Sequence, residues 1–161
     1  MKPIVLATDG SPSAAEATLK AIELAQLLEA PLLAVAVEHV TIPSYGYFGY
    51  AQILSEARKI EQKHVDETLV HAKAVASEAG VDCDTMHGTG PVVDAICDTA
   101  RQHQAQLIVI GAHGWGPVKR AVHGSISTGV LHEAPCPVLV VRGGPETRLD
   151  TAALDEAVLA S

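Results

Sequence analysis

A glycine-rich loop from Gly111 to Ser125 holds the residue types in this sequence that are best suited to bind a ligand. Glycine lets the backbone approach a ligand closely and adopt positive φ angles. Successive N–H groups can then point into one concavity and hold phosphate. Gly124 and Ser125 open an expected helix, and the N–H groups and dipole of a helix start favour an anion. The pattern predicts a phosphate site, against the alternative of a long connection without a ligand.

Side chains in and beside this loop add candidate contacts. The hydroxyls of Ser125 and Ser127 are hydrogen-bond donors, and Lys119 and Arg120 carry positive charge. His113 has two open interpretations, an exposed loop residue or a ligand contact. No nucleophile stands in a motif that also supplies its base, so no catalytic residue is assigned.

Alternating strands and helices are expected to position this loop. Short apolar runs without polar alternation are typical of strands covered on both faces. They span Ile4–Ala7, Leu32–Val37, Leu107–Ile110 and Val138–Val141, with a weaker strand at about Asp82–His87. Helical periodicity covers about residues 13–29 and 53–79, a third helix begins at Pro91, and a fourth runs from Ser125 to about His132.

This order predicts an α/β fold, with a parallel sheet between two helical layers. In such sheets a ligand binds beyond the carboxyl ends of the strands, where the winding reverses. The first helix has start signals in Ser11 and Pro12, and Ser13 with Glu16 has capping-box spacing. Its apolar stripe is expected to include Thr18, Ile22, Ala25 and Leu28, and Gly80 is expected to end the second helix.

Composition limits the classes of function. The 161 residues fit one domain, and the net charge of −8 argues against nucleic-acid binding. The three cysteines form no CxxC pair, which argues against a zinc site or a disulfide framework. No apolar run is long enough for a signal peptide or a membrane span, so we expect a cytoplasmic protein without membrane contact.

Gly111 and Gly114 are followed after nine residues by Gly124 and Ser125. This spacing resembles the nucleotide-binding motif of the universal stress protein family, in its ATP-binding branch. The stretch LHEAPCPVLVVR at 131–142 resembles its closing strand, and IVLATDGS at 4–11 resembles its first strand and turn. The similarity covers about residues 1–142, the expected nucleotide-binding domain, and leaves 143–161 as a C-terminal tail.

The resemblance implies a Rossmann-like fold of the adenine nucleotide alpha hydrolase type, with five parallel strands in the order 3-2-1-4-5. It implies ATP as ligand, with Mg²⁺ or Mn²⁺ bridging Asp9 and the phosphates, and a homodimer paired along Val138–Val141. The residues implied to contact the nucleotide are Ala7, Thr8, Asp9, Val37, Ile110, Gly111, His113, Gly114, Gly124, Ser125, Ile126 and Ser127.

Some features leave alternatives open. Asp9 is either a nucleotide neighbour or a turn residue before the first helix. Ala112 stands where the family often has a hydroxyl residue. The loop Val40–Gln52 contains Tyr45, Tyr47, Phe48 and Tyr50, and serves either as a lid over the base or as a surface for a partner. The family varies in this loop, so its role does not carry over.

The leading functional hypothesis is an ATP-binding stress-response regulator or sensor. It would pass a nucleotide-dependent change in the Val40–Gln52 loop, or in the dimer, to an unidentified protein partner. The alternatives are a slow ATPase or adenylate-transferring enzyme, and a protein-interaction module that binds no nucleotide. No GxxxxGK[ST] motif is present, which excludes a P-loop NTPase.

Overall fold

Strands and helices alternate along the chain in the computed structural model, which describes residues 1–39, 50–112 and 124–142. The elements are β1 (Ile4–Ala7), α1 (Pro12–Leu27), β2 (Leu32–Val37), α2 (Tyr50–Glu78), β3 (Cys83–Gly88), α3 (Val92–Gln102), β4 (Leu107–Gly111), α4 (Ser125–Glu133) and β5 (Val138–Val141).

The strands form one parallel sheet in the order β3-β2-β1-β4-β5. All four residues of the central strand β1 are buried, because helices cover both faces of the sheet. The winding reverses between β1 and β4, so the carboxyl ends of these two strands form the switch point at which such sheets bind ligands. The predicted fold and strand order are confirmed.

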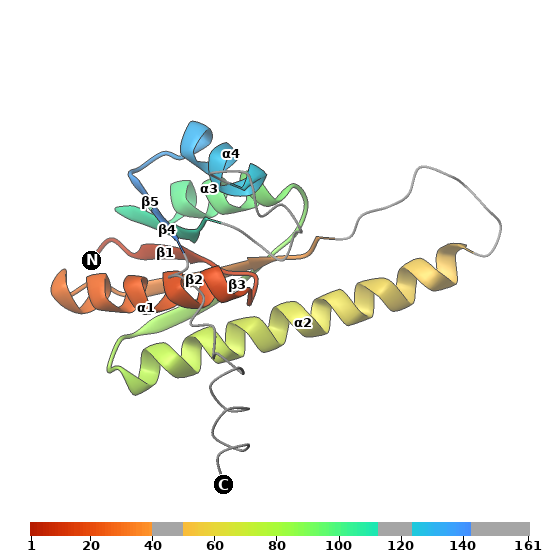
Figure 1. Ribbon diagram of the computed structural model, residues 1–161, viewed down its shortest axis with the longest axis horizontal. Coiled ribbons are helices and arrows are strands. Elements are labelled where there is room, and N and C mark those ends of the chain that lie inside the picture. Colours follow the sequence, from red (N-terminus) through yellow and green to blue (C-terminus); the bar gives the residue numbers. More distant parts are fainter. Residues whose placement is uncertain (40–49, 113–123, 143–161) are drawn as a thin grey trace, which may run out of the picture.

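Two apolar cores lie on opposite faces of the sheet. In Figure 1, α1 and α2 lie below the sheet, and α3 and α4 lie above it. Small buried side chains such as Ala17, Ala21 and Ala76 fill the first core and let the helices lie close to the strands. Ile96 and Val130 bring α3 and α4 into the second core.

The start of α1 follows from its local sequence. Ser11 is the N-cap residue, and its hydroxyl accepts a hydrogen bond from the N–H of Ala14 at 3.3 Å. Pro12 occupies the first helical position, where its missing N–H costs nothing. Leu28 was expected in the buried stripe and is 47% exposed, because the helix has ended at Leu27.

Other predicted boundaries differ from the structure by a few residues, as is usual at the ends of elements. Pro91 is the N-cap residue of α3 with ψ of 128°, so the helix begins at Val92. The weak strand lies one residue later than predicted, and β4 also includes Gly111. Gly80, with φ of +74°, follows α2 as predicted.

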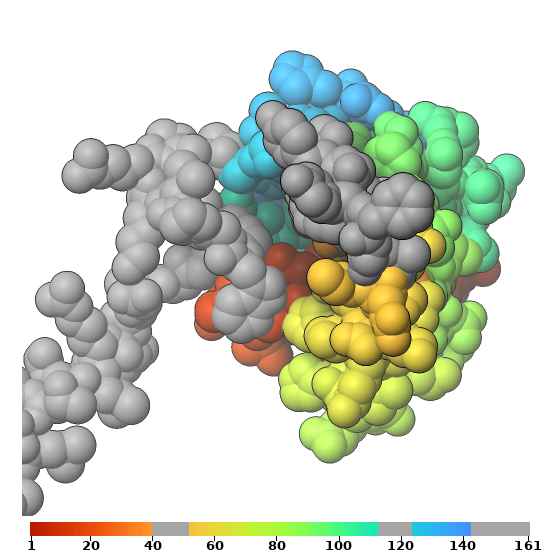
Figure 2. All heavy atoms as spheres, turned by 90° about the vertical axis from the view of Figure 1, so that its right-hand side faces the viewer, coloured from red at the N-terminus to blue at the C-terminus, as the bar shows by residue number. Residues whose placement is uncertain are grey.

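Helix α2 projects beyond the sheet. Its 29 residues span about 43 Å, whereas the six residues of β2 span about 20 Å. The first buried side chain described in α2 is Val65, so the turns before it extend past the carboxyl ends of the strands (Figure 1). Figure 2 views the molecule from that end, with α2 in yellow facing the viewer and α4 in blue on the other side of the sheet.

Among the described residues, none of the helices combines the length and apolar character that a membrane span requires.

Candidate functional site

The turn after β1 lies at the switch point and is held by its own side chains. The Asp9 carboxylate accepts a hydrogen bond from the N–H of Ser11 at 2.9 Å, which makes it a turn-forming residue. Gly10 has a φ of +75°, a conformation that disfavours any residue with a side chain. Asp9 is exposed at the carboxyl end of the sheet. The turn interpretation is confirmed without excluding a role toward a ligand.

Gly111 ends β4 directly against the start of α1. A Cβ built on Gly111 would lie 2.8 Å from the carbonyl carbon and 2.9 Å from the carbonyl oxygen of Ser13, closer than real Cβ contacts. The missing side chain therefore lets α1 pack against the end of β4. This contact also places the start of α1 beside the carboxyl end of β4.

The start of α4 lies against the end of β4. The N–H of Gly124 donates to the carbonyl of Ala112 at 2.8 Å, and the N–H of Ala112 donates to the carbonyl of Val141 at 2.8 Å. The buried hydroxyl of Ser127 lies 3.0 Å from the carbonyl of Gly124 and 3.3 Å from that of Ala112. A hydroxyl has one proton to donate, so this side chain holds the helix start in place.

The first turn of α4 has the properties of an anion site. Gly124 is the N-cap residue and supplies no side-chain cap, and no acidic residue lies in the first turn. The N–H groups of Ser125, Ile126 and Ser127 lie at this positive end of the helix dipole. Ser125 is exposed, and Ile126 packs against the second core. This geometry fits phosphate binding by the main chain.

The remaining predicted site residues lie along the same edge of the sheet. Ala7 and Ile110 are partners in the β1–β4 register. Thr8 is buried, and its N–H donates to the carbonyl of Val35 at 2.9 Å. Val37 ends β2 and is half-buried. These positions are therefore brought together with Asp9, Gly111 and the start of α4.

Other predictions lie outside the described residues, namely those for His113, Gly114, Lys119, Arg120 and most of the loop Val40–Gln52. Among the residues that are described, no group of three or more histidine, cysteine or acidic side chains could hold a metal ion.

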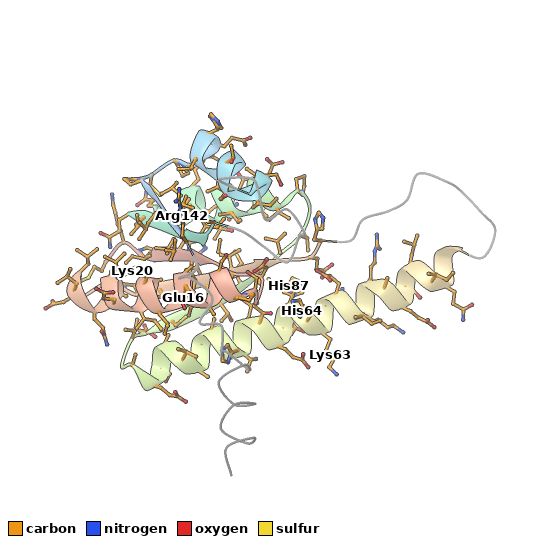
Figure 3. All side chains as sticks on the ribbon, in the orientation of Figure 1. Glu16, Lys20, Lys63, His64, His87 and Arg142 are labelled. Atoms are coloured by element: carbon orange, nitrogen blue, oxygen red, sulfur yellow. The ribbon has the colours of Figure 1, made fainter. Side chains whose placement is uncertain are left out.

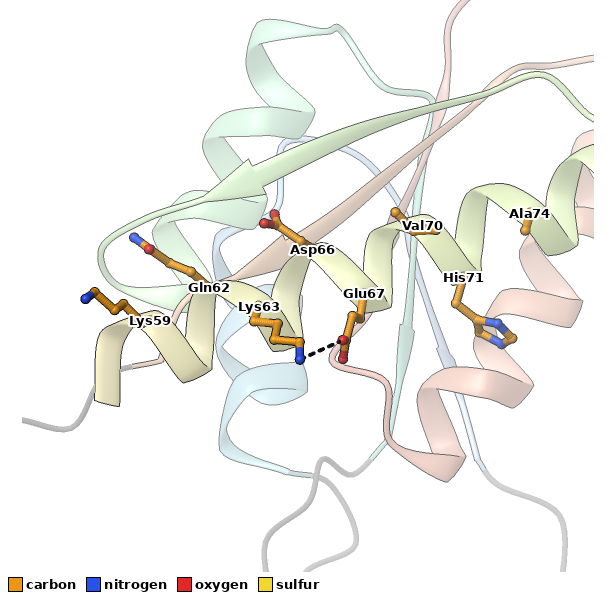
Figure 4. A pocket seen from close by; sticks show the side chains of 8 residues that line it. All are labelled: Lys59, Gln62, Lys63, Asp66, Glu67, Val70, His71 and Ala74. Carbon is orange, nitrogen blue, oxygen red and sulfur yellow. Dashed lines mark ion pairs between the residues drawn. The ribbon is translucent and has the colours of Figure 1, made fainter. Parts of the chain in front are cut away.

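A hollow formed by described residues lies elsewhere, on the exposed face of α2 (Figure 4). Its lining comes from one helix: Lys59, Gln62, Lys63, Asp66, Glu67, Val70, His71 and Ala74. Lys63 and Glu67 form an ion pair at 3.7 Å across it, with both side chains largely exposed. Because its described lining comes from one helix alone, polar groups of separate elements do not converge on this hollow as they do at the start of α4.

Two histidines near the site were missed by sequence reasoning. The Nε2 atom of His64, on α2, lies 3.1 Å from the carbonyl oxygen of Asp9. The Nδ1 atom of His87 lies 3.2 Å from a carboxylate oxygen of Asp66. Its Nε2 atom lies 2.7 Å from Glu38, close enough for an ion pair but misaligned for a hydrogen bond. Figure 3 shows both histidines where α2 passes the ends of the strands.

Comparison with known proteins agrees with this geometry. The model of the universal stress protein family matches residues 1–142. A universal stress protein of Methanocaldococcus jannaschii is 34% identical over 145 residues, which is 88% of this chain and 82% of that protein.

Solved structures show the same fold. The universal stress protein UspA from Lactobacillus plantarum has a TM-score of 0.78 at 29% identity, covering 88% of this chain and 97% of that one. The universal stress protein from Archaeoglobus fulgidus in complex with dAMP has a TM-score of 0.60 at 25% identity, covering 88% of this chain and 98% of that one. The chain described here therefore belongs to the universal stress protein family.

Proposed function

We propose that this chain binds ATP at the switch point between β1 and β4 and acts in the cytoplasm as a stress-response regulator. The main support is the start of α4, where the first-turn N–H groups have no side-chain cap and the N-cap residue Gly124 is hydrogen-bonded to Ala112 just after β4. The dAMP complex of the Archaeoglobus fulgidus relative supports an adenine nucleotide as the ligand class. We assign this role to a domain of residues 1–142, followed by a tail.

Each part of the nucleotide has a proposed partner. The main chain at Ser125–Ser127 would hold phosphate, and the end of β2 at Val37 would meet the base. The exposed carboxylate of Asp9 fits a shared Mg²⁺ or Mn²⁺, because Mg²⁺ is usually held by one or two carboxylates together with substrate phosphates. Such a cation would neutralise phosphate charge beside Asp9.

Regulation would follow from a change in assembly or in contacts with a protein partner when nucleotide binds. The edge strand β5 supports a homodimer. The carbonyl of Pro137 accepts a hydrogen bond from Ile108 of β4, and that of Val141 accepts one from Ala112 just after β4. In a strand, alternate residues face opposite neighbours, so the main chain of Val138 and Val140 faces away from the sheet and can pair with a second copy.

The nucleotide proposal is tested by placing a negative charge at the start of α4. Asp is well tolerated in the first turn of a helix, so Ser125→Asp should fold, yet it should repel phosphate. We expect ATP affinity, measured by calorimetry with Mg²⁺ present, to fall at least about tenfold. Ser55→Asp is the matched control, because Ser55 is an exposed serine on α2. Equal affinity in the two variants, or no binding by the unchanged protein, contradicts the proposal.

A further inference from the structure

One stretch of α2 is tied to the carboxyl ends of three neighbouring strands. Each contact joins a polar side chain to a residue at or just beyond a strand end. Helix α2 is therefore fixed at the carboxyl ends of the strands, where the ligand is proposed to bind. The pairs are Glu61 Oε1 with His39 N at 3.2 Å, His64 Nε2 with Asp9 O at 3.1 Å, and Asp66 Oδ1 with His87 Nδ1 at 3.2 Å.

The tie from His64 differs from the other two because it reaches the candidate site itself. Its Nε2–H donates to the carbonyl of Asp9, which shares a planar peptide unit with the N–H of Gly10. The next turn of α2 also lies close to Gly10. A Cβ added to Gly10 would lie 3.0 Å from Thr68 Oγ1 and 3.6 Å from His64 Cε1. The turn is therefore hydrogen-bonded by His64 and lies close to Thr68.

The Asp9 side chain belongs to the turn that this hydrogen bond reaches. Its carboxylate is oriented by the hydrogen bond from the Ser11 N–H, which comes from the far side of the same turn. If the peptide after Asp9 rotates, Gly10 offers little resistance, because glycine has access to both positive and negative φ. Two hydrogen bonds limit that freedom. The Gly10 N–H donates to Thr8 Oγ1 at 3.4 Å, and the Asp9 carbonyl accepts from His64 Nε2 at 3.1 Å.

We propose that His64 is a positioning residue for the nucleotide site, fixing the Asp9–Gly10 peptide so that the Asp9 carboxylate points toward the cation and phosphates. The inference rests on the proposed function. The hydrogen bond from His64 also links α2, which projects past the carboxyl ends of the strands, to the site. Binding at the site and the position of α2 are then coupled through one hydrogen bond.

Three variants test the proposal. His64→Ala removes the donor, and His64→Gln places an amide nitrogen at a similar reach from the backbone. His71→Ala is the matched control, because His71 is an exposed histidine two turns further along α2. We expect ATP affinity to fall about fivefold in His64→Ala, the loss typical of one neutral hydrogen bond. His64→Gln and His71→Ala should each remain within about twofold of the unchanged protein.

The amide ¹⁵N resonance of Gly10, recorded without nucleotide, gives a second readout. It should move in His64→Ala, return toward its original position in His64→Gln and stay in place in His71→Ala. Wild-type affinity in His64→Ala, or no rescue by glutamine, overturns the positioning role. Failure of the unchanged protein to bind ATP overturns the proposed function and this inference with it. An ATP titration of the unchanged protein distinguishes the two failures, because it tests the proposed function without any change at His64.

Discussion

Replacing Gly111 with alanine tests whether the switch point depends on close contact between α1 and β4. The added Cβ would lie 2.8 and 2.9 Å from main-chain atoms of Ser13, and it would also meet the Ser13 hydroxyl. Ser13 is in the first turn of α1, so relief requires the helix start to move rather than a side chain to rotate. Gly111 is not among the residues with positive φ, so the cost is one of space and not of backbone conformation.

The expected cost follows from overpacking in a closely packed interior. Inserted methyl groups in such sites destabilise by about 1–3 kcal/mol. We expect the upper part of this range, about 3 kcal/mol, because the obstructing atoms are backbone. For a domain of this size, that loss corresponds to a melting temperature lower by roughly 6–12 °C. Urea unfolding without nucleotide measures it directly.

Gly129→Ala provides the comparison. Its Cβ would lie 2.7 Å from Cγ2 of Val93, which is a side chain and can adjust. Alanine also favours a helix interior over glycine by about 1 kcal/mol, so we expect a net change below about 1 kcal/mol. In Gly111→Ala, a second change of Ser13→Ala should not restore stability, because the main-chain contacts remain. A Gly111→Ala protein within about 0.5 kcal/mol of the original refutes the reasoning.

Two further predictions concern the edge strand and the thiols. Val140→Pro removes an N–H group that faces away from β4 and that would pair with a second copy. Light scattering should therefore show a dimer for the original chain and a monomer for the variant. A variant that stays dimeric contradicts pairing along β5. Burial raises the pKa of the thiols of Cys83, Cys97 and Cys136. Their folded pKa lies above the unfolded value, so their contribution to stability is complete below about pH 8.5 and is lost as the pH rises through the folded pKa. The free energy of unfolding should fall as the pH rises from about 8 to 10, and it should fall less in Cys83→Ala. An equal decrease in the two proteins contradicts this.

The fold could be predicted because its signals are local. Runs of Val, Leu and Ile without polar alternation identified β1, β2 and β5 at their observed bounds. The edge strand β3 was weaker in sequence because Asp84 and Thr85 are exposed on it. The start of α1 was clear in the sequence, because Ser11 is a good N-cap residue and Pro12 favours the first helical position.

The site was only partly predictable. The sequence indicated which loops meet at the switch point, because parallel strands place their carboxyl ends together. It carried no sign that Gly111 accommodates Ser13, or that His64 reaches Asp9 across 55 positions of chain. Both contacts arise from how α1 and α2 pack on the sheet. The hydroxyl of Ser127, expected to be a ligand donor, lies buried against main-chain carbonyls because the start of α4 packs on the end of β4.

The most direct test of the account is a titration of ¹⁵N-labelled protein with ATP and Mg²⁺, followed by NMR. We predict that the largest shift changes among the described residues occur at 8–11, 111–112 and 124–127, where the turn after β1 meets the start of α4. No change on saturation with ATP, or changes centred on the exposed face of α2 near Val70 and Ala74, would contradict a nucleotide site at the switch point.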